Sequence, residues 1–257
     1  MPDTPPLPNH APAPRTARAR CVSCQRPVSS CLCCWICPTA QAVSVLVLQH
    51  PAERAQAKGS VRLLQLSLQP CQVEVGEYFD PVALAGWLAA PGNAAPAALK
   101  LPLPLPLPLP LPLPLPLPLP LPLPLPLPLP LPLPLPPPPR SLLLYPVEPG
   151  DPAATVLTLP LADPARWRLV LLDGTWRQTR QLLRLNPLLQ VLPRWALPEP
   201  APSRYAIRRA QRPEQRSTLE AACLALAALQ GDAERFAPLL AAFDGWVAAE
   251  LARRPAA

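Results

Sequence analysis

A run of alternating leucine and proline fills residues 101–136, and three further prolines extend it to residue 139. Proline fixes φ and lacks an amide hydrogen, and the residue before a proline is driven away from the helical region. We therefore expect an extended polyproline-like rod that contributes neither a helix nor a central strand. The tract holds 21 of the chain's 47 prolines. Any packed core must come from the two flanks, with the tract as a low-complexity loop insertion; a ligand for a proline-binding domain is the alternative.

The two flanks alternate strand patterns with helical patterns. We expect strands at residues 42–49, 71–79, 141–146 and 169–172, and helices at residues 61–68, 81–90 and 176–185. This alternation is typical of an α/β domain with a mostly parallel sheet. Ligands of such sheets bind at the carboxyl ends of the strands. His50 and Asp173 both stand at predicted strand ends, which makes that edge a candidate site.

Positive charge is concentrated in one segment. Residues 166–216 contain 11 arginines against three acidic residues, which gives +8, while the whole chain carries +7. Because guanidinium groups bind phosphate bidentately and stack on bases, this segment indicates a nucleic acid or another polyanion as partner. The alternative is a GC-rich genome that has replaced lysine by arginine on a solvated face, since Lys58 and Lys100 are the only lysines.

The N-terminal residues 1–20 have no apolar segment, so we expect a disordered basic arm and no signal peptide. The longest apolar run is half proline, so the sequence predicts no membrane span. These features predict a cytoplasmic protein whose cysteines stay reduced unless a metal holds them. No feature indicates an obligate protein partner.

Six of the eight cysteines lie close together, at Cys21, Cys24, Cys31, Cys33, Cys34 and Cys37. The first two form a CxxC pair and the next two form a CxC pair. Four thiolates at these spacings can surround one tetrahedral zinc ion, and such a full shell is structural and not catalytic. Either of the last two cysteines could replace a member of the CxC pair. Free or redox-active thiols are the alternative to a zinc knuckle at residues 21–38.

The predicted strand at residues 169–172 runs into Asp173-Gly174-Thr175-Trp176. Gly174 allows the backbone to approach a ligand closely, Thr175 can cap the following helix, and Trp176 offers a flat surface for stacking. The alternative is a tight turn that is followed by a core tryptophan.

A second motif, Ser-Thr-Leu-Glu, occupies residues 217–220 and matches a capping box, with Ser217 as N-cap and Glu220 at N3. Gly231 would end this helix. The free amides of a helix N-terminus attract a carboxylate or a phosphate, although an ordinary cap is the alternative. The sequence has no nucleophile elbow, Walker loop or dinucleotide fingerprint, which argues against those chemistries.

Six sets of motifs follow one another along the chain: CVSC with CLC (residues 21–33), HPAE (50–53), KGSVRLLQLSL (58–68), VGEYF (75–79), LLDGTWRQTRQLLRLNPLLQVLP (171–193) and SRYAIRRAQRPEQRSTLEA (203–221). In this order they resemble the DTW-domain family of tRNA-uridine aminocarboxypropyltransferases. Together they cover most of the chain outside the arm and the Leu-Pro tract, which has no counterpart in the family pattern.

The resemblance implies that residues 39–257 form a DTW-type α/β transferase domain, related to the SPOUT methyltransferases, with a deep trefoil knot. It also implies transfer of the 3-amino-3-carboxypropyl group of S-adenosylmethionine to N3 of a tRNA uridine, with release of methylthioadenosine. The alternatives are a non-catalytic zinc-knuckle RNA-binding protein and an S-adenosylmethionine-dependent RNA methyltransferase.

For this reaction, the positions and chemistry of individual residues suggest their roles. Asp173 would be catalytic, either accepting the uridine proton or orienting the donor. The expected donor-binding residues are His50, Leu172, Gly174, Thr175, Trp176, Ser217, Thr218 and Glu220. The expected tRNA-binding residues are Arg177, Arg180, Arg184, Arg204, Arg208 and Arg209. The expected zinc ligands are Cys21, Cys24, Cys31 and Cys33.

Overall fold

The computed structural model describes residues 19–54, 56, 59–90, 140–147, 150–151, 153–197 and 216–253. The expected basic arm, apart from its last two residues, and the Leu-Pro tract lie outside the described residues.

Five parallel strands form one sheet within the described residues, in the order β2-β1-β4-β3-β5. The strands are β1 (Thr39–Gln49), β2 (Leu68–Val75), β3 (Arg140–Leu144), β4 (Trp167–Asp173) and β5 (Arg194–Trp195). The expected parallel α/β fold is thus confirmed. The prediction for β2 was wrong at both ends, because the strand begins at Leu68 and stops before Gly76. The two-residue β5 was not predicted, since so short a strand leaves no periodic pattern.

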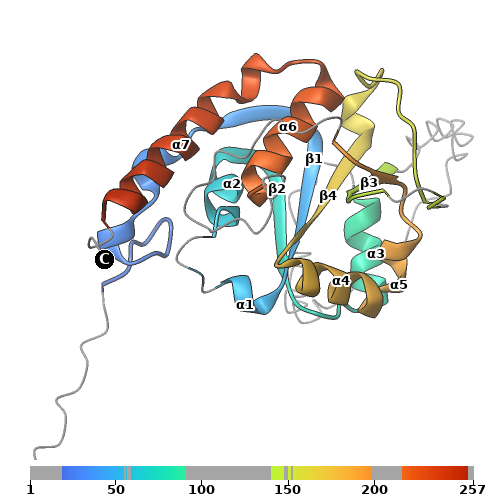
Figure 1. Ribbon diagram of the computed structural model, residues 1–257, viewed down its shortest axis with the longest axis horizontal. Coiled ribbons are helices and arrows are strands. Elements are labelled where there is room, and N and C mark those ends of the chain that lie inside the picture. Colours follow the sequence, from blue (N-terminus) through green and yellow to red (C-terminus); the bar gives the residue numbers. More distant parts are fainter. Residues whose placement is uncertain are drawn as a thin grey trace, which may run out of the picture.

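Helices surround the sheet (Figure 1). They are α1 (Pro51–Arg54), α2 (Val61–Ser67), α3 (Pro81–Ala89), α4 (Trp176–Leu185), α5 (Pro187–Gln190), α6 (Thr218–Gln230) and α7 (Ala237–Ala252), with short 3-10 turns at Val28–Ser30, Cys33–Trp35, Pro164–Arg166 and Glu234–Phe236. Both expected N-caps are present, since Thr175 forms a capping box with Gln178 and Ser217 forms one with Glu220. Gly231 ends α6 with a left-handed φ of 68°.

The apolar residues of β1 point alternately into two cores, one on each face of the sheet. Val43, Val45 and Val47 belong to the core shared with α2, α6 and α7. Leu46 and Leu48 belong to the core shared with α3, α4 and α5 on the opposite face. A strand that is covered on both faces reads as a continuous apolar run, which explains why this strand was visible in the sequence.

The connections that follow the neighbouring parallel strands β1 and β4 lead toward opposite edges of the sheet. From β1 the chain passes through α2 to β2 at one edge, and from β4 it passes through α4 and α5 toward β5 at the other edge. Where the connections of two adjacent strands diverge in this way, the carboxyl ends of the strands form the usual ligand site of an open α/β sheet. Gln49 and Asp173, the last residues of β1 and β4, are paired in register at this position.

Residues 198–215, which connect the β5 region to α6, lie outside the described residues. The described residues do not test the trefoil knot, which stays a prediction. No helix within the described part of the chain has both the length and the hydrophobicity needed to cross a bilayer.

Candidate functional site

Asp173 joins three segments that are distant in sequence. Its carboxylate is largely buried, with Oδ2 accepting a hydrogen bond from Gln49 Nε2 at 2.8 Å and Oδ1 accepting one from Thr218 Oγ1 at 2.5 Å. Both of these donors are neutral. The side chain of Asp173 is therefore oriented by its neighbours, and neither of these two contacts supplies a positive charge. This junction brings the Asp-Gly-Thr-Trp and Ser-Thr-Leu-Glu motifs together.

His50 lies beside the junction. Its backbone N–H donates to the Asp173 carbonyl at 2.9 Å, and its Nδ1 accepts from the Ala52 N–H at 3.2 Å. Its Nε2 lies 2.9 Å from Oε1 of Glu77. Because Nδ1 is used as an acceptor, a neutral imidazole carries its hydrogen on Nε2 and donates it to Glu77.

Glu77 is a site residue that sequence reasoning missed. Its Oε2 accepts a hydrogen bond from Gln181 Nε2 at 2.9 Å, and 44% of its side chain is exposed. The predicted strand at residues 71–79 placed Glu77 inside the strand. With β2 ending at Val75, Glu77 instead stands just past a strand's carboxyl end, the same position that drew attention to His50 and Asp173. Gln49 was missed for a different reason, because it closes an apolar run as its last residue.

The turn after Asp173 is tightly packed. A Cβ on Gly174 would lie 3.0 Å from Gln178 Cβ and 3.5 Å from His50 Cβ, so a larger residue here would require Gln178 to shift slightly. The Thr175 hydroxyl accepts from the Gln178 N–H, while the Thr175 N–H donates to Gln178 Oε1 at 2.6 Å. Leu172, before the turn, is half-buried against the core beneath α4.

Trp176 is not a core residue. Its side chain is 45% exposed, and its ring meets that of Tyr145 edge to face, with centroids 6.1 Å apart. The alternative of a core tryptophan is therefore wrong, and an indole face remains available for stacking.

At the start of α6, Ser217 and Glu220 bind each other. The Ser217 hydroxyl and N–H both donate to Glu220 Oε2 at 3.0 Å, and the Glu220 N–H donates to Ser217 Oγ at 3.2 Å. Leu219 N–H donates to Ser60 Oγ at 3.4 Å. These bonds satisfy amides of the helix terminus internally, and Thr218 is the residue of this motif whose hydroxyl reaches Asp173.

Three of the expected tRNA-binding residues share the outer face of α4. Arg177, Arg180 and Arg184 are exposed, and with Gln181 they line a surface concavity of about 460 Å³. We call this set the arginine face. Spacings of three and four residues put these side chains on one side of a helix. The other three residues of this group, Arg204, Arg208 and Arg209, lie outside the described residues.

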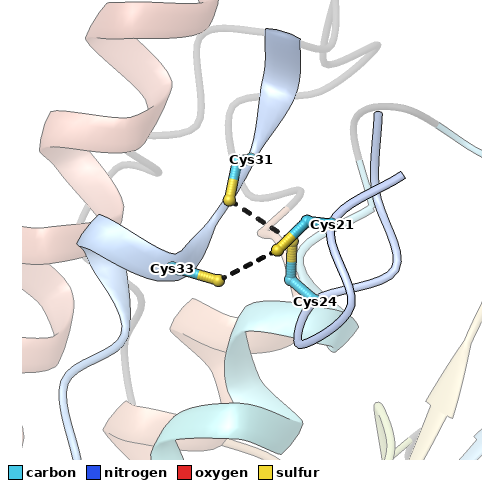
Figure 2. Close-up of side chains that lie close together, drawn as sticks. All are labelled: Cys21, Cys24, Cys31 and Cys33. Atoms are coloured by element: carbon cyan, nitrogen blue, oxygen red, sulfur yellow. Dashed lines mark hydrogen bonds between the residues drawn. The ribbon is translucent and has the colours of Figure 1, made fainter. Parts of the chain in front are cut away.

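The four expected zinc ligands converge (Figure 2). Their sulfur atoms all lie within 4.8 Å of one another, with Cys21 3.5 Å from Cys33 and Cys24 3.7 Å from Cys31. Zinc–sulfur bonds of about 2.3 Å in a tetrahedron require sulfur separations of about 3.8 Å, so this donor set fits the metal. Cys34 is exposed and is not part of this group.

Electrostatics within the cluster favour a thiolate. Backbone hydrogen bonds at Cys24 and Ser23 lower the pKa of the Cys21 thiol to about 6. Hydrogen bonds to Cys21 and Cys31 raise the pKa of Cys33 to about 12, because these neighbouring thiols compete for protons. A bound divalent cation would remove this competition by favouring the thiolate form of every ligand.

The cysteine segment is packed onto the main domain. Arg62 of α2 donates to the carbonyls of Ser23 and Cys24 at 2.9 and 3.2 Å. Leu32 is fully buried in the same core as α6 and α7, and the Trp35 ring lies against Gly245 of α7. Figure 1 shows this segment beside one end of α7. A metal here would therefore stabilise part of the common core.

The fold and the site define an α/β protein with a polar junction at the switch point of a parallel sheet and a four-cysteine knuckle at its N-terminal side. The chain belongs to the DTW-domain family, whose model matches residues 18–250, as the sequence motifs predicted.

Two proteins that are similar to this chain in sequence carry the same name. The chain is 29% identical over 225 residues to tRNA-uridine aminocarboxypropyltransferase 2 of Drosophila melanogaster, covering 86% of this chain and 70% of that protein. It is 25% identical over 221 residues to tRNA-uridine aminocarboxypropyltransferase 2 of Mus musculus, covering 83% of this chain and 57% of that protein. No solved structure matches the chain significantly.

Proposed function

We propose that the protein transfers the 3-amino-3-carboxypropyl group of S-adenosylmethionine to N3 of a uridine in tRNA and releases methylthioadenosine. The observation that carries the proposal is the junction at Asp173, where the two motifs most characteristic of the family meet at the switch point of the sheet. The names of the fly and mouse relatives support the same reaction.

The reaction is an in-line displacement. N3 of uridine attacks the methylene carbon beside the sulfonium, the carbon–sulfur bond breaks with its electron pair on sulfur, and the N3 proton leaves. Such a step depends on positioning and on charge stabilisation. A buried carboxylate suits a cationic sulfonium donor, so we assign Asp173 to orienting that donor.

We assign direct donor contacts to His50, Leu172, Gly174, Thr175, Trp176 and Thr218. Ser217 and Glu220 act by capping α6 and thereby hold Thr218 beside Asp173.

The arginine face is our candidate surface for tRNA phosphates. We also propose phosphate contacts for Arg204, Arg208 and Arg209. We also propose a trefoil knot in the DTW-type domain of residues 39–257, a structural zinc in the knuckle of residues 21–38, and a cytoplasmic location, where tRNA is found. The zinc ligands would be Cys21, Cys24, Cys31 and Cys33, whose separations suit a tetrahedral ion.

Purified protein that is incubated with tRNA and S-adenosylmethionine tests this function. Mass spectrometry should detect methylthioadenosine and a uridine that carries the amino-acid group. S-adenosylhomocysteine with methylated tRNA would instead identify a methyltransferase, and tRNA binding without either product would identify a binding protein. Asp173→Ala should abolish transfer while tRNA still binds, and full activity in that variant would remove Asp173 from the mechanism.

A further inference from the structure

Two carboxylates lie at the carboxyl ends of β4 and β2, and they differ in accessibility. Asp173 is largely buried and accepts hydrogen bonds at both oxygens. Glu77 also accepts one bond at each oxygen, but 44% of its side chain is exposed. Since an ionised carboxylate oxygen can accept a second hydrogen bond, Glu77 can bind a further donor that approaches from solvent.

Glu77 connects the two parts of the proposed active site. Through Oε1 it contacts His50, whose backbone is bonded to Asp173. Through Oε2 it contacts Gln181, which lines the arginine face. Glu77 is thus one hydrogen bond away from a residue that lines the candidate phosphate-binding surface.

The backbone around Glu77 is anchored from α4. Asn186, which is 2% exposed, donates to the Glu77 carbonyl at 2.9 Å and accepts from the Phe79 N–H at 2.9 Å. Glu77 is therefore held through both its main chain and its side chain. This preorganisation is more than a solvated surface glutamate requires.

We propose that Glu77 accepts the N3 proton of the target uridine; this inference rests on the proposed function. As the proton moves to the carboxylate, the N3 lone pair forms the bond to the methylene carbon and the carbon–sulfur bond breaks toward sulfur. The protonated glutamate then loses its proton to solvent. His50 and Gln181 act as positioning residues, because each donates to one carboxylate oxygen and directs the other lone pairs outward.

The test uses Glu77→Gln with Glu74→Gln as control. Glu74 is a half-buried glutamate on β2 whose carboxylate accepts a hydrogen bond from Gln72 at 3.0 Å. It takes no part in the hydrogen bonds of Glu77 or Asp173 described above. We expect Glu77→Gln to slow transfer by about 10²- to 10⁴-fold, the range typical of a lost general base. Its affinities for tRNA and for S-adenosylmethionine should remain within about twofold of wild type, since the charge change is local. The control should keep the wild-type rate.

A tRNA with 5-fluorouridine at the target position separates proton removal from a structural role. Fluorine makes the N3 proton more acidic, so most of the lost rate should return in Glu77→Gln. If the variant is slow on both substrates, or is as fast as wild type on uridine, the proposal is overturned. Glu77→Asp keeps a carboxylate and should exceed the glutamine variant at least tenfold; equal rates would also overturn it. A wild-type enzyme without any transfer activity would instead refute the proposed function itself.

Discussion

Asn186→Ala should destabilise the protein far more than its position at a helix end suggests. The side chain is buried and makes three hydrogen bonds: to the Glu77 carbonyl at 2.9 Å, to the Leu182 carbonyl at 2.8 Å and from the Phe79 N–H at 2.9 Å. Alanine removes all three and leaves the N–H of a buried phenylalanine and two carbonyls without this partner.

The expected loss can be worked from these contacts. Each buried backbone group that loses its partner lowers the free energy of unfolding by about 1–3 kcal/mol. Three groups are affected here, and one of them, the Leu182 carbonyl, lies within the helix α4. We therefore expect a loss of about 3 kcal/mol in the free energy of unfolding. For a domain of this size, about 1 kcal/mol lowers the melting temperature by about 2–4 °C, so the expected shift is about 6–12 °C.

Thermal and urea unfolding, followed by circular dichroism, measure this effect. Gln190→Ala is the matched control, because Gln190 is exposed and its amide donates to the Leu183 carbonyl at 2.9 Å. The control should stay within about 0.5 kcal/mol of wild type. If Asn186→Ala is no more destabilising than Gln190→Ala, the buried amide does not hold the segment after β2, and the argument for a preorganised Glu77 loses its support.

Four further outcomes are expected. Gly245→Ala should cost about 1–3 kcal/mol by overpacking, because its Cβ would lie 2.4 Å from the Trp35 ring. Gly86→Ala has nothing within 4 Å of the new Cβ and should stabilise α3 by about 0.5–1 kcal/mol; unfolding curves that rank the two glycines the other way would contradict this packing. Each single replacement of Arg177, Arg180 or Arg184 by alanine should reduce the slope of log affinity for tRNA against log salt concentration by about one. Filter binding across salt concentrations measures this slope, and an unchanged slope would exclude a phosphate contact at that residue. Elemental analysis should find about one zinc per chain, as a single tetrahedral site requires, and the Cys21→Ser/Cys24→Ser double variant should lose both the metal and thermal stability; metal-free protein of wild-type stability would remove the zinc assignment.

Local signals in the sequence accounted for most of the helices that build the site. The bounds of α4 and the capping box of α6 were predicted, because capping residues and the left-handed Gly231 act within a few residues of the chain. The helix α7 was missed, because it is rich in alanine, contains Gly245 and shows no clear apolar stripe. Its apolar side chains contact α6 on one side and the cysteine segment on another.

The sequence by itself determined a parallel α/β domain, a four-cysteine cluster, an arginine-rich helix and a strand that ends on Asp173. These follow from periodicity, spacing and composition, which are properties of short segments. Only the tertiary structure decided that Asp173 is bound by Gln49 and Thr218, and that Glu77 is held between His50 and Gln181. The hydrogen bonds of Glu77 and Asp173 join residues far apart in the chain, and no local pattern encodes such a pairing. The strand order β2-β1-β4 brings those residues to one edge, and that order depends on how the whole core packs.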